Sequence, residues 1–105
     1  MTEYTPDSWC LLKIKPGKLD PPFYKVLATW NGGYLHGDAW RINSGITLME
    51  DDGDYYNFYG ESGSLYRCHK EGQHVSSIAA SVYRSLKEKE AFEGQIELVE
   101  DFKIE

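Results

Sequence analysis

The stretch that decides the fold is DYYNFYGESGSLYRCH, residues 54–69. Its two halves, 54–60 and 64–69, each alternate two sets of side chains at the two-residue period of a β-strand. The glycine and serine residues within 61–63 are typical of a turn. The pattern therefore predicts an antiparallel β-hairpin that is rich in aromatic rings.

Alternation divides this hairpin into two faces. The apolar set, which we expect to form core, consists of Tyr56, Phe58, Tyr66 and Cys68. The opposite set can stack and form hydrogen bonds, and it consists of Tyr55, Asn57, Tyr59, Arg67 and His69. Directly opposed residues of paired strands lie about 4.5–5.5 Å apart at Cβ. These five residues are therefore predicted to form one surface, the Tyr-Arg-His patch.

Two more strands are predicted on the N-terminal side of the hairpin. Residues 8–15, SWCLLKIK, and residues 23–30, FYKVLATW, both alternate at period 2. Pro16-Gly17 ends the first of them. Residues 1–7 are mostly polar and are predicted to be a flexible tail.

The chain between residues 30 and 54 predicts further antiparallel strands. Asn31-Gly32 is typical of a two-residue hairpin turn, because both residues tolerate a positive φ. Residues 34–42, YLHGDAWRI, are therefore predicted to pair with the preceding strand, and Gly37 indicates a bulge. Residues 46–51, ITLMED, add a strand before the aromatic hairpin.

The period changes after the hairpin. In residues 74–90, HVSSIAASVYRSLKEKE, the apolar side chains recur at helical spacing, which predicts an amphipathic helix that ends near Gly94. Residues 94–105, GQIELVEDFKIE, return to period 2 and predict a final strand. The fold class is α+β: a curved, mainly antiparallel sheet of about six short strands in a meander, with one helix on a face. A barrel-like closure of this sheet stays open as one arrangement.

The composition indicates one small globular domain, residues 1–105. The chain is 41% hydrophobic and 14% aromatic, so large rings can build the core. Seventeen acidic against eleven basic residues give a net charge of −6, which argues against binding of the nucleic-acid backbone. No apolar run reaches the ~20 residues that cross a bilayer, and no secretory signal precedes the first strand. With two cysteines, Cys10 and Cys68, these features predict a cytoplasmic protein with free thiols.

No catalytic or metal-binding motif emerges from the residues. GESGS at 60–64 lacks the last glycine of Gly-x-Ser-x-Gly, and a strand follows it instead of a helix. His36 and Asp38 share a strand face and form an acid–base pair in principle, although a structural hydrogen bond is the favoured role. The cysteines and histidines lack the spacing of zinc ligands. We therefore expect a protein that is not an enzyme and that needs no metal or cofactor.

The motifs WRINSGI, residues 40–46, and DYYNFYGESGSLYRCH resemble those of small proteins encoded by tailed bacteriophages. The likeness covers residues 24–70. It implies a protein made in a bacterial cytoplasm during infection, which acts by inhibiting a host protein or by sequestering a nucleotide signal. The resemblance assigns no role to any residue.

The leading hypothesis is a non-enzymatic binding protein, a phage counter-defence factor that sequesters a small nucleotide-like ligand on the Tyr-Arg-His patch. Trp40 and Arg41, at a neighbouring turn, supplement this site. The alternative is an acidic inhibitor that blocks a host protein, with candidate contacts at Asp51, Asp52, Asp54, Glu97, Glu100 and Asp101. A small hydrolase or nuclease comes third. An open sheet edge also predicts a homo-oligomer.

Overall fold

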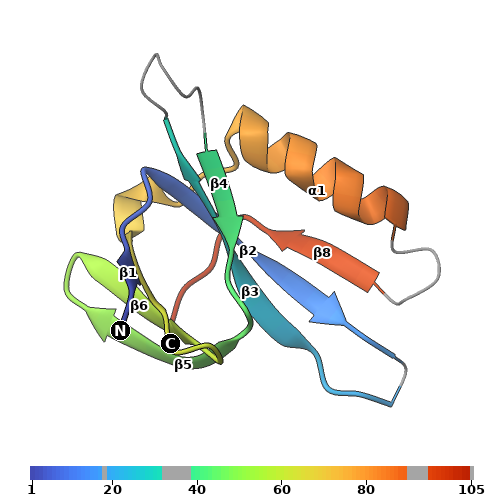
Figure 1. Ribbon diagram of the computed structural model, residues 1–105, viewed down its shortest axis with the longest axis horizontal. Helices are drawn as coiled ribbons and strands as arrows, with labels where there is room; N and C mark the ends of the chain where they lie inside the picture. The colour runs from blue at the N-terminus through green and yellow to red at the C-terminus, as the bar shows by residue number, and fades with distance from the viewer. Residues whose placement is uncertain (18, 32–38, 90–94, 105) are drawn as a thin grey trace.

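The computed structural model describes residues 1–17, 19–31, 39–89 and 95–104 (Figure 1). These residues contain two four-stranded sheets, sheet A with the order β1-β7-β6-β5 and sheet B with the order β4-β3-β2-β8. The strands are β1 (Glu3–Tyr4), β2 (Ser8–Lys15), β3 (Phe23–Trp30), β4 (Ala39–Ile42), β5 (Ile46–Asp52), β6 (Tyr55–Gly60), β7 (Leu65–His69) and β8 (Gln95–Val99). The helices are η1 (Lys70–Gly72), a 3-10 turn, and α1 (Ser77–Lys89).

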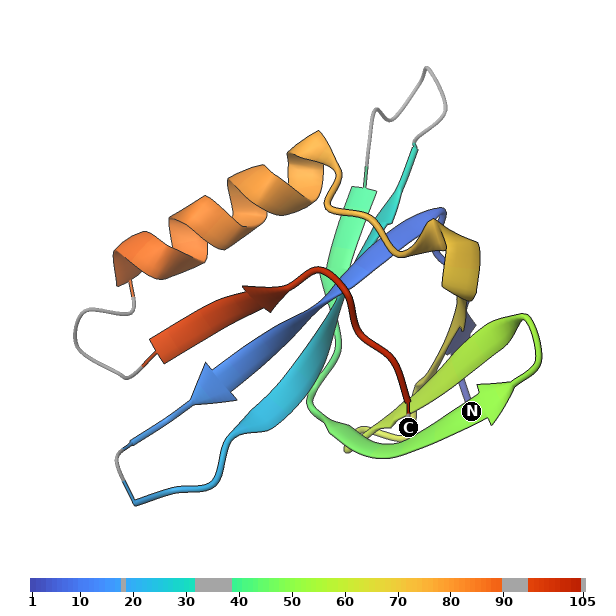
Figure 2. The same cartoon turned by 180° about the vertical axis from the view of Figure 1, so that it is seen from behind.

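Strand β2 lies in the middle of three layers, and both of its faces are buried. Trp9 and Leu11 are fully buried against sheet A, in the core between the two sheets. Cys10 and Leu12 point the other way, into a second core that α1 covers. Successive side chains of a strand point to opposite faces, so the uninterrupted apolar run in β2 needs cover on both sides. Figures 1 and 2 show sheet B between α1 and sheet A.

Trp9 ties the two sheets together. Its indole Nε1 donates a hydrogen bond to the His69 carbonyl oxygen at the end of β7, at 2.7 Å. Its ring packs against two rings of β6, with centroid distances of 6.0 Å to Tyr56 and 5.4 Å to Phe58. The core between the sheets is therefore apolar, and the indole hydrogen bond fixes the orientation of Trp9 within it.

Asn43 forms the corner at which the chain leaves sheet B for sheet A. Its side-chain Oδ1 accepts a hydrogen bond from the Val26 backbone N–H at 2.8 Å, and its own backbone N–H donates to the Val26 carbonyl at 3.1 Å. Gly60 lies against this corner, where a Cβ would stand 3.0 Å from the Ser44 Oγ and 3.3 Å from the Asn43 Nδ2. Asn43 and Ser44 of the WRINSGI motif therefore have a structural role, because they shape the corner between the two sheets.

Helix α1 begins with a capping serine and packs on sheet B. The Ser76 Oγ accepts a hydrogen bond from the Ala79 backbone N–H at 3.1 Å, as an N-cap does. Ala79 is buried, and Tyr83 donates from its hydroxyl to the Ile96 carbonyl of β8 at 3.2 Å. The predicted helix is therefore confirmed over Ser77–Lys89. Its predicted end near Gly94 lies outside the described residues.

The segment after β8, residues 100–104, leaves sheet B and crosses to sheet A (Figure 2). We call it the strap. Phe102 and Ile104 pack against the core between the sheets. Period 2 predicted that the final strand runs on through this segment, but the strand ends at Val99. The reason is that side chains take up the hydrogen-bonding groups of the strap: the Gln73 carboxamide bonds to both backbone groups of Phe102.

The α+β class, the mainly antiparallel pairing and the helix followed by a final strand are confirmed. The single curved sheet of about six strands is corrected to two sheets, neither of which closes into a barrel. Residues 1–7 are not a free tail, because Glu3–Tyr4 forms β1 and pairs in parallel with β7. The Tyr4 ring holds this segment against sheet A, because it packs on the ring of Tyr66 with a centroid distance of 4.9 Å.

Strands β3 and β4 pair as predicted, and their register places Trp30 opposite Ala39. The predicted turn at Asn31-Gly32 includes Gly32 and so lies in part outside the described residues. The predicted bulge at Gly37 and the predicted pair of His36 and Asp38 lie outside the described residues.

The two environments of tryptophan give a matched test of this core. Trp9→Phe removes the indole N–H, leaves the partly buried His69 carbonyl without its donor and leaves space in the core, so we expect a loss of about 2–4 kcal/mol in the free energy of unfolding. Trp40→Phe, at a side chain that is 51% exposed, should change it by no more than about 0.5 kcal/mol. Urea denaturation measures both values, and equal losses would contradict the assignment of Trp9 as the link between the sheets.

Candidate functional site

The structure brings the five residues of the Tyr-Arg-His patch together on the outer face of sheet A. In the register of β6 and β7, Tyr55 lies opposite His69 and Asn57 lies opposite Arg67. The other set of the hairpin, Tyr56, Phe58, Tyr66 and Cys68, is buried between the sheets. The division of the hairpin into a core face and an outer face is therefore confirmed.

Arg67 is the centre of the patch, and its charge is already engaged. Its Nη1 donates to the Asp52 Oδ2 at 2.6 Å and to the Asn57 Oδ1 at 3.2 Å. Its guanidinium carbon lies 4.2 Å from the ring centroid of Tyr55, as in a cation–π contact. The guanidinium therefore holds three neighbours in place.

The other two side chains of the patch also have partners within the chain. The Tyr59 hydroxyl donates to the Glu50 Oε1 at 2.8 Å, and this bond raises the pKa of Tyr59 above its ordinary value. The His69 Nδ1 accepts a hydrogen bond from the Glu71 backbone N–H at 3.1 Å, which caps η1. The ring of His69 meets Tyr55 edge-on at a centroid distance of 5.0 Å.

Strand β5 adds two carboxylates to this face. Its register places Glu50 opposite Asn57 and Asp52 opposite Tyr55. The acidic contacts predicted from the sequence include Asp52, on a surface separate from the patch, and do not include Glu50. The alternation of ITLMEDD, residues 46–52, next to the hairpin is the signal that would have placed both residues on the outer face. With two carboxylates around one guanidinium, this face carries a net negative charge.

Trp40 and Arg41 do not join the patch. They are neighbours on β4, so they point to opposite faces of sheet B. Arg41 lies over the ring of Tyr4, with its guanidinium carbon 4.6 Å from the centroid. Trp40 lies on the face of sheet B that α1 covers. This face points away from sheet A, so Trp40 is far from the patch.

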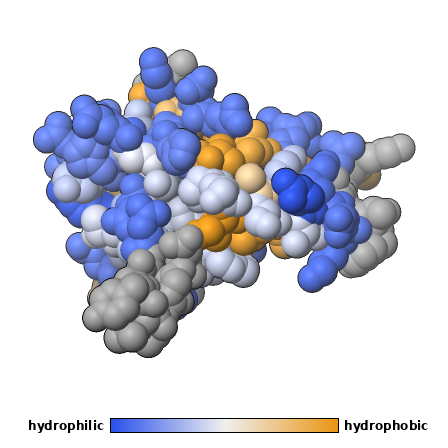
Figure 3. Space-filling model, turned by 90° about the horizontal axis from the view of Figure 1, so that it is seen from above, coloured by the Kyte–Doolittle hydropathy of each residue, from blue (hydrophilic) through white to orange (hydrophobic). Residues whose placement is uncertain are grey.

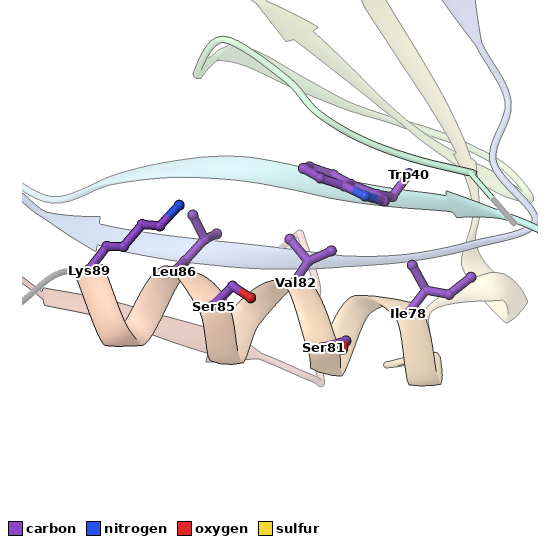
Figure 4. A pocket seen from close by; sticks show the side chains of 7 residues that line it. All are labelled: Trp40, Ile78, Ser81, Val82, Ser85, Leu86 and Lys89. Atoms are coloured by element: carbon purple, nitrogen blue, oxygen red, sulfur yellow. The ribbon is translucent and has the colours of Figure 1, made fainter.

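Trp40 lines an open groove of about 460 Å³ between β4 and α1. Figure 4 shows Ile78, Val82 and Leu86 pointing from the helix toward the side on which the Trp40 ring lies. The rest of the lining consists of Ser81, Ser85 and Lys89. Viewed from the side of α1, hydrophobic residues form a band near the middle of the molecule, with hydrophilic residues around it (Figure 3). Helical spacing predicted the apolar stripe but could not show that it is only half covered.

Neither cysteine is placed for chemistry. Both thiols are buried, and burial raises the pKa of Cys10 to about 12 and raises that of Cys68 as well. A thiol with a raised pKa carries little thiolate, which is the reactive form. Within the described ranges, no group of three or more histidine, cysteine or acidic residues is positioned to hold a metal ion.

The comparisons with known proteins leave the family open. No protein-family model, curated protein or solved structure matches the chain. The resemblance to small proteins of tailed bacteriophages therefore stays a prediction. In the part of the chain that the structure describes, no helix is long and apolar enough to cross a bilayer.

The ion pair of Arg67 and Asp52 predicts a measurable titration. The hydrogen bond and charge of Arg67 hold the pKa of Asp52 below its ordinary value of about 3.9. The ion pair therefore stabilises the folded state fully above pH about 3.9, and this stabilisation is lost as the pH falls through the lowered pKa of Asp52. Arg67→Ala should return the pKa of Asp52 toward about 3.9 in carboxyl NMR titrations. Lys70→Ala, which removes the partner of Asp51, should leave it unchanged, and an unshifted pKa in Arg67→Ala would rule out the pair in solution.

The buried thiols predict low reactivity of the folded protein. An aromatic disulfide reagent should modify neither cysteine under native conditions and both cysteines in urea, because only unfolding exposes them and restores their ordinary pKa. Absorbance of the released thiolate measures the rate. Native modification faster than global unfolding would contradict the burial of Cys10 and Cys68.

Proposed function

We propose that this protein is a non-enzymatic binding protein that recognises a basic surface of another protein through the outer face of sheet A. The observation that carries the proposal is the set of carboxylates and rings that three neighbouring strands align on this face. Glu50 and Asp52 lie beside Tyr55 and Tyr59, and Leu48, which is 54% exposed, lies opposite Tyr59 in the register.

The internal contacts of the face support a binding role. Tyr59 is held by Glu50, and Tyr55 is held between Arg67 and His69. Side chains that are fixed before binding lose less conformational entropy when a partner arrives. Tyrosine and arginine are also enriched in protein interfaces and among their energetic hot spots.

The charge of the chain favours a basic partner. A net charge of −6 attracts cationic surfaces over a range of about a Debye length, about 8–10 Å at physiological salt. Three of the acidic candidates, Asp51, Asp52 and Asp54, lie where β5 turns into β6, at the edge of this face. The other three, Glu97, Glu100 and Asp101, lie on β8 and the strap, away from it.

A nucleotide-like ligand has weaker support on this face. Arg67 is its natural phosphate partner, but Asp52 already occupies the guanidinium at 2.6 Å. A phosphate would have to displace this carboxylate and lie near Glu50, and like charges oppose both steps. Sequestration of a nucleotide therefore becomes the alternative outcome of the test below. The phage counter-defence setting, the cytoplasmic location and the homo-oligomer stay predictions.

Charge reversal on two opposite layers tests the proposal. Partners captured from bacterial lysate at low salt are identified, and their affinity is then measured by calorimetry with purified partner. Glu50→Lys, on the outer face of sheet A, should weaken binding at least about tenfold, which is about 1.4 kcal/mol. Glu88→Lys makes the same charge change on α1 and should weaken it less than about threefold.

Two results would count against the proposed partner. Equal losses in both variants would show that only net charge matters and that the face has no special role. A rise in the melting temperature with one member of a nucleotide panel, abolished by Arg67→Ala, would assign the face to a nucleotide instead.

A further inference from the structure

The strap docks on the core like a bound peptide. Along it, Phe102 and Ile104 are half-buried, whereas Asp101 and Lys103 are exposed. This alternation is that of an extended segment with one side against a surface. The strap belongs to neither sheet, since β8 ends at Val99.

Side chains, and not a neighbouring strand, recognise the backbone of the strap. The Gln73 Nε2 donates to the Phe102 carbonyl oxygen at 3.0 Å, and the Phe102 N–H donates to the Gln73 Oε1 at 2.5 Å. Two residues on, the Ile104 N–H donates to the Tyr56 hydroxyl at 3.4 Å. The backbone of Gln73 is itself fixed by a parallel bridge to Trp9. The Gln73 carboxamide therefore makes the two backbone hydrogen bonds with Phe102 that a neighbouring strand would otherwise make.

An aromatic seat receives the Phe102 side chain. Its ring centroid lies 5.8 Å from those of Tyr56 and Phe58 and 6.5 Å from that of Tyr24. These rings come from both sheets, from β3 and β6, so the seat lies between them. Tilted and edge-on packing at such distances is the favourable geometry for aromatic pairs.

We propose that this seat is a binding site for an extended segment of another protein in which an aromatic residue is followed, two positions later, by an aliphatic one. The strap fills the site when no such segment is present. Every contact above is made by a side chain or a backbone group of the strap that any peptide with this pattern also carries. None of them depends on the covalent link to β8.

The strap makes the site self-inhibited. Because it is tethered at Val99, its effective concentration at the seat is on the order of millimolar or above, and a partner segment has to outcompete it. The seat lies on the core side of sheet A, opposite the face on which the Tyr-Arg-His patch is found. This proposal therefore stands or falls independently of the function proposed above.

Emptying the seat tests the proposal. The probe is a fluorescent peptide with the sequence of residues 99–104, VEDFKI, and its affinity is read by fluorescence polarisation. Phe102→Ala removes the internal competitor, so the peptide should bind this variant at least about tenfold tighter than the wild-type chain. The peptide VEDAKI, which lacks the ring, should bind neither protein.

Second variants separate recognition from general loosening of the fold. Adding Gln73→Ala to Phe102→Ala should lower the peptide affinity at least about tenfold, because both backbone hydrogen bonds are lost. Adding Glu88→Ala, at an exposed position of α1, should leave it unchanged. If Phe102→Ala does not fold by circular dichroism, Ile104→Ala takes its place and should show the same direction of change.

Two outcomes would overturn the proposal. Equal affinity of VEDFKI for the variant and the wild type, or equal binding of VEDFKI and VEDAKI, would show that the seat does not select a peptide. A wild-type dimer in sedimentation that Phe102→Ala dissolves would assign the seat to the strap of a second copy and not to a foreign partner.

Discussion

Strand β2 is buried on both faces, and this constraint arranges the rest of the structure. Trp9 and Leu11 need cover on one side and Cys10 and Leu12 on the other, because apolar surface left in water costs about 25 cal/mol per Å². Sheet A supplies the first cover and α1 the second. The indole N–H adds direction, since its bond to the His69 carbonyl fixes the end of β7 against β2. The surfaces that remain for binding are the outer face of sheet A, the groove between α1 and β4, and the seat between the sheets that the strap fills.

The alternation of the aromatic hairpin was sufficient to predict which of its side chains lie inside, because a strand has only two faces. It could not predict that the sheet divides into two. The chain leaves sheet B at Asn43, whose side chain accepts the hydrogen bond of the Val26 backbone N–H in place of a backbone group from a neighbouring strand. The periodicity of the sequence does not indicate such a residue. A strand as short as β1 carries no alternation at all, and its position depends on how Tyr4 packs against Tyr66.

The candidate site was predictable only within the hairpin, where a short turn fixes the register. The residues that set its chemistry, Glu50 and Asp52, come from β5, and their pairing with β6 is decided by the whole strand and not by one motif. Once they are in place, Arg67 is not a free cation but the centre of a hydrogen-bonded network with Asp52 and Asn57. The half-covered groove at Trp40 was hidden for a similar reason: helical spacing shows which stripe is apolar but not how far the neighbouring strand reaches over it.

The neighbours of β2 in sheet B also determine when the fold can be completed. Strands β5, β6 and β7 follow one another in the sequence and pair in that order through short connections, whereas β1 joins sheet A only when β7 is present. Strand β2 pairs with β8, and every strand from β3 to β7 lies between them in the sequence. During synthesis, the edge of β2 that pairs with β8 therefore stays unpaired until residues 95–99 have left the ribosome. Such long-range pairing slows folding, and it makes the interval before β8 arrives the time at which the nascent chain most needs protection from association with other chains.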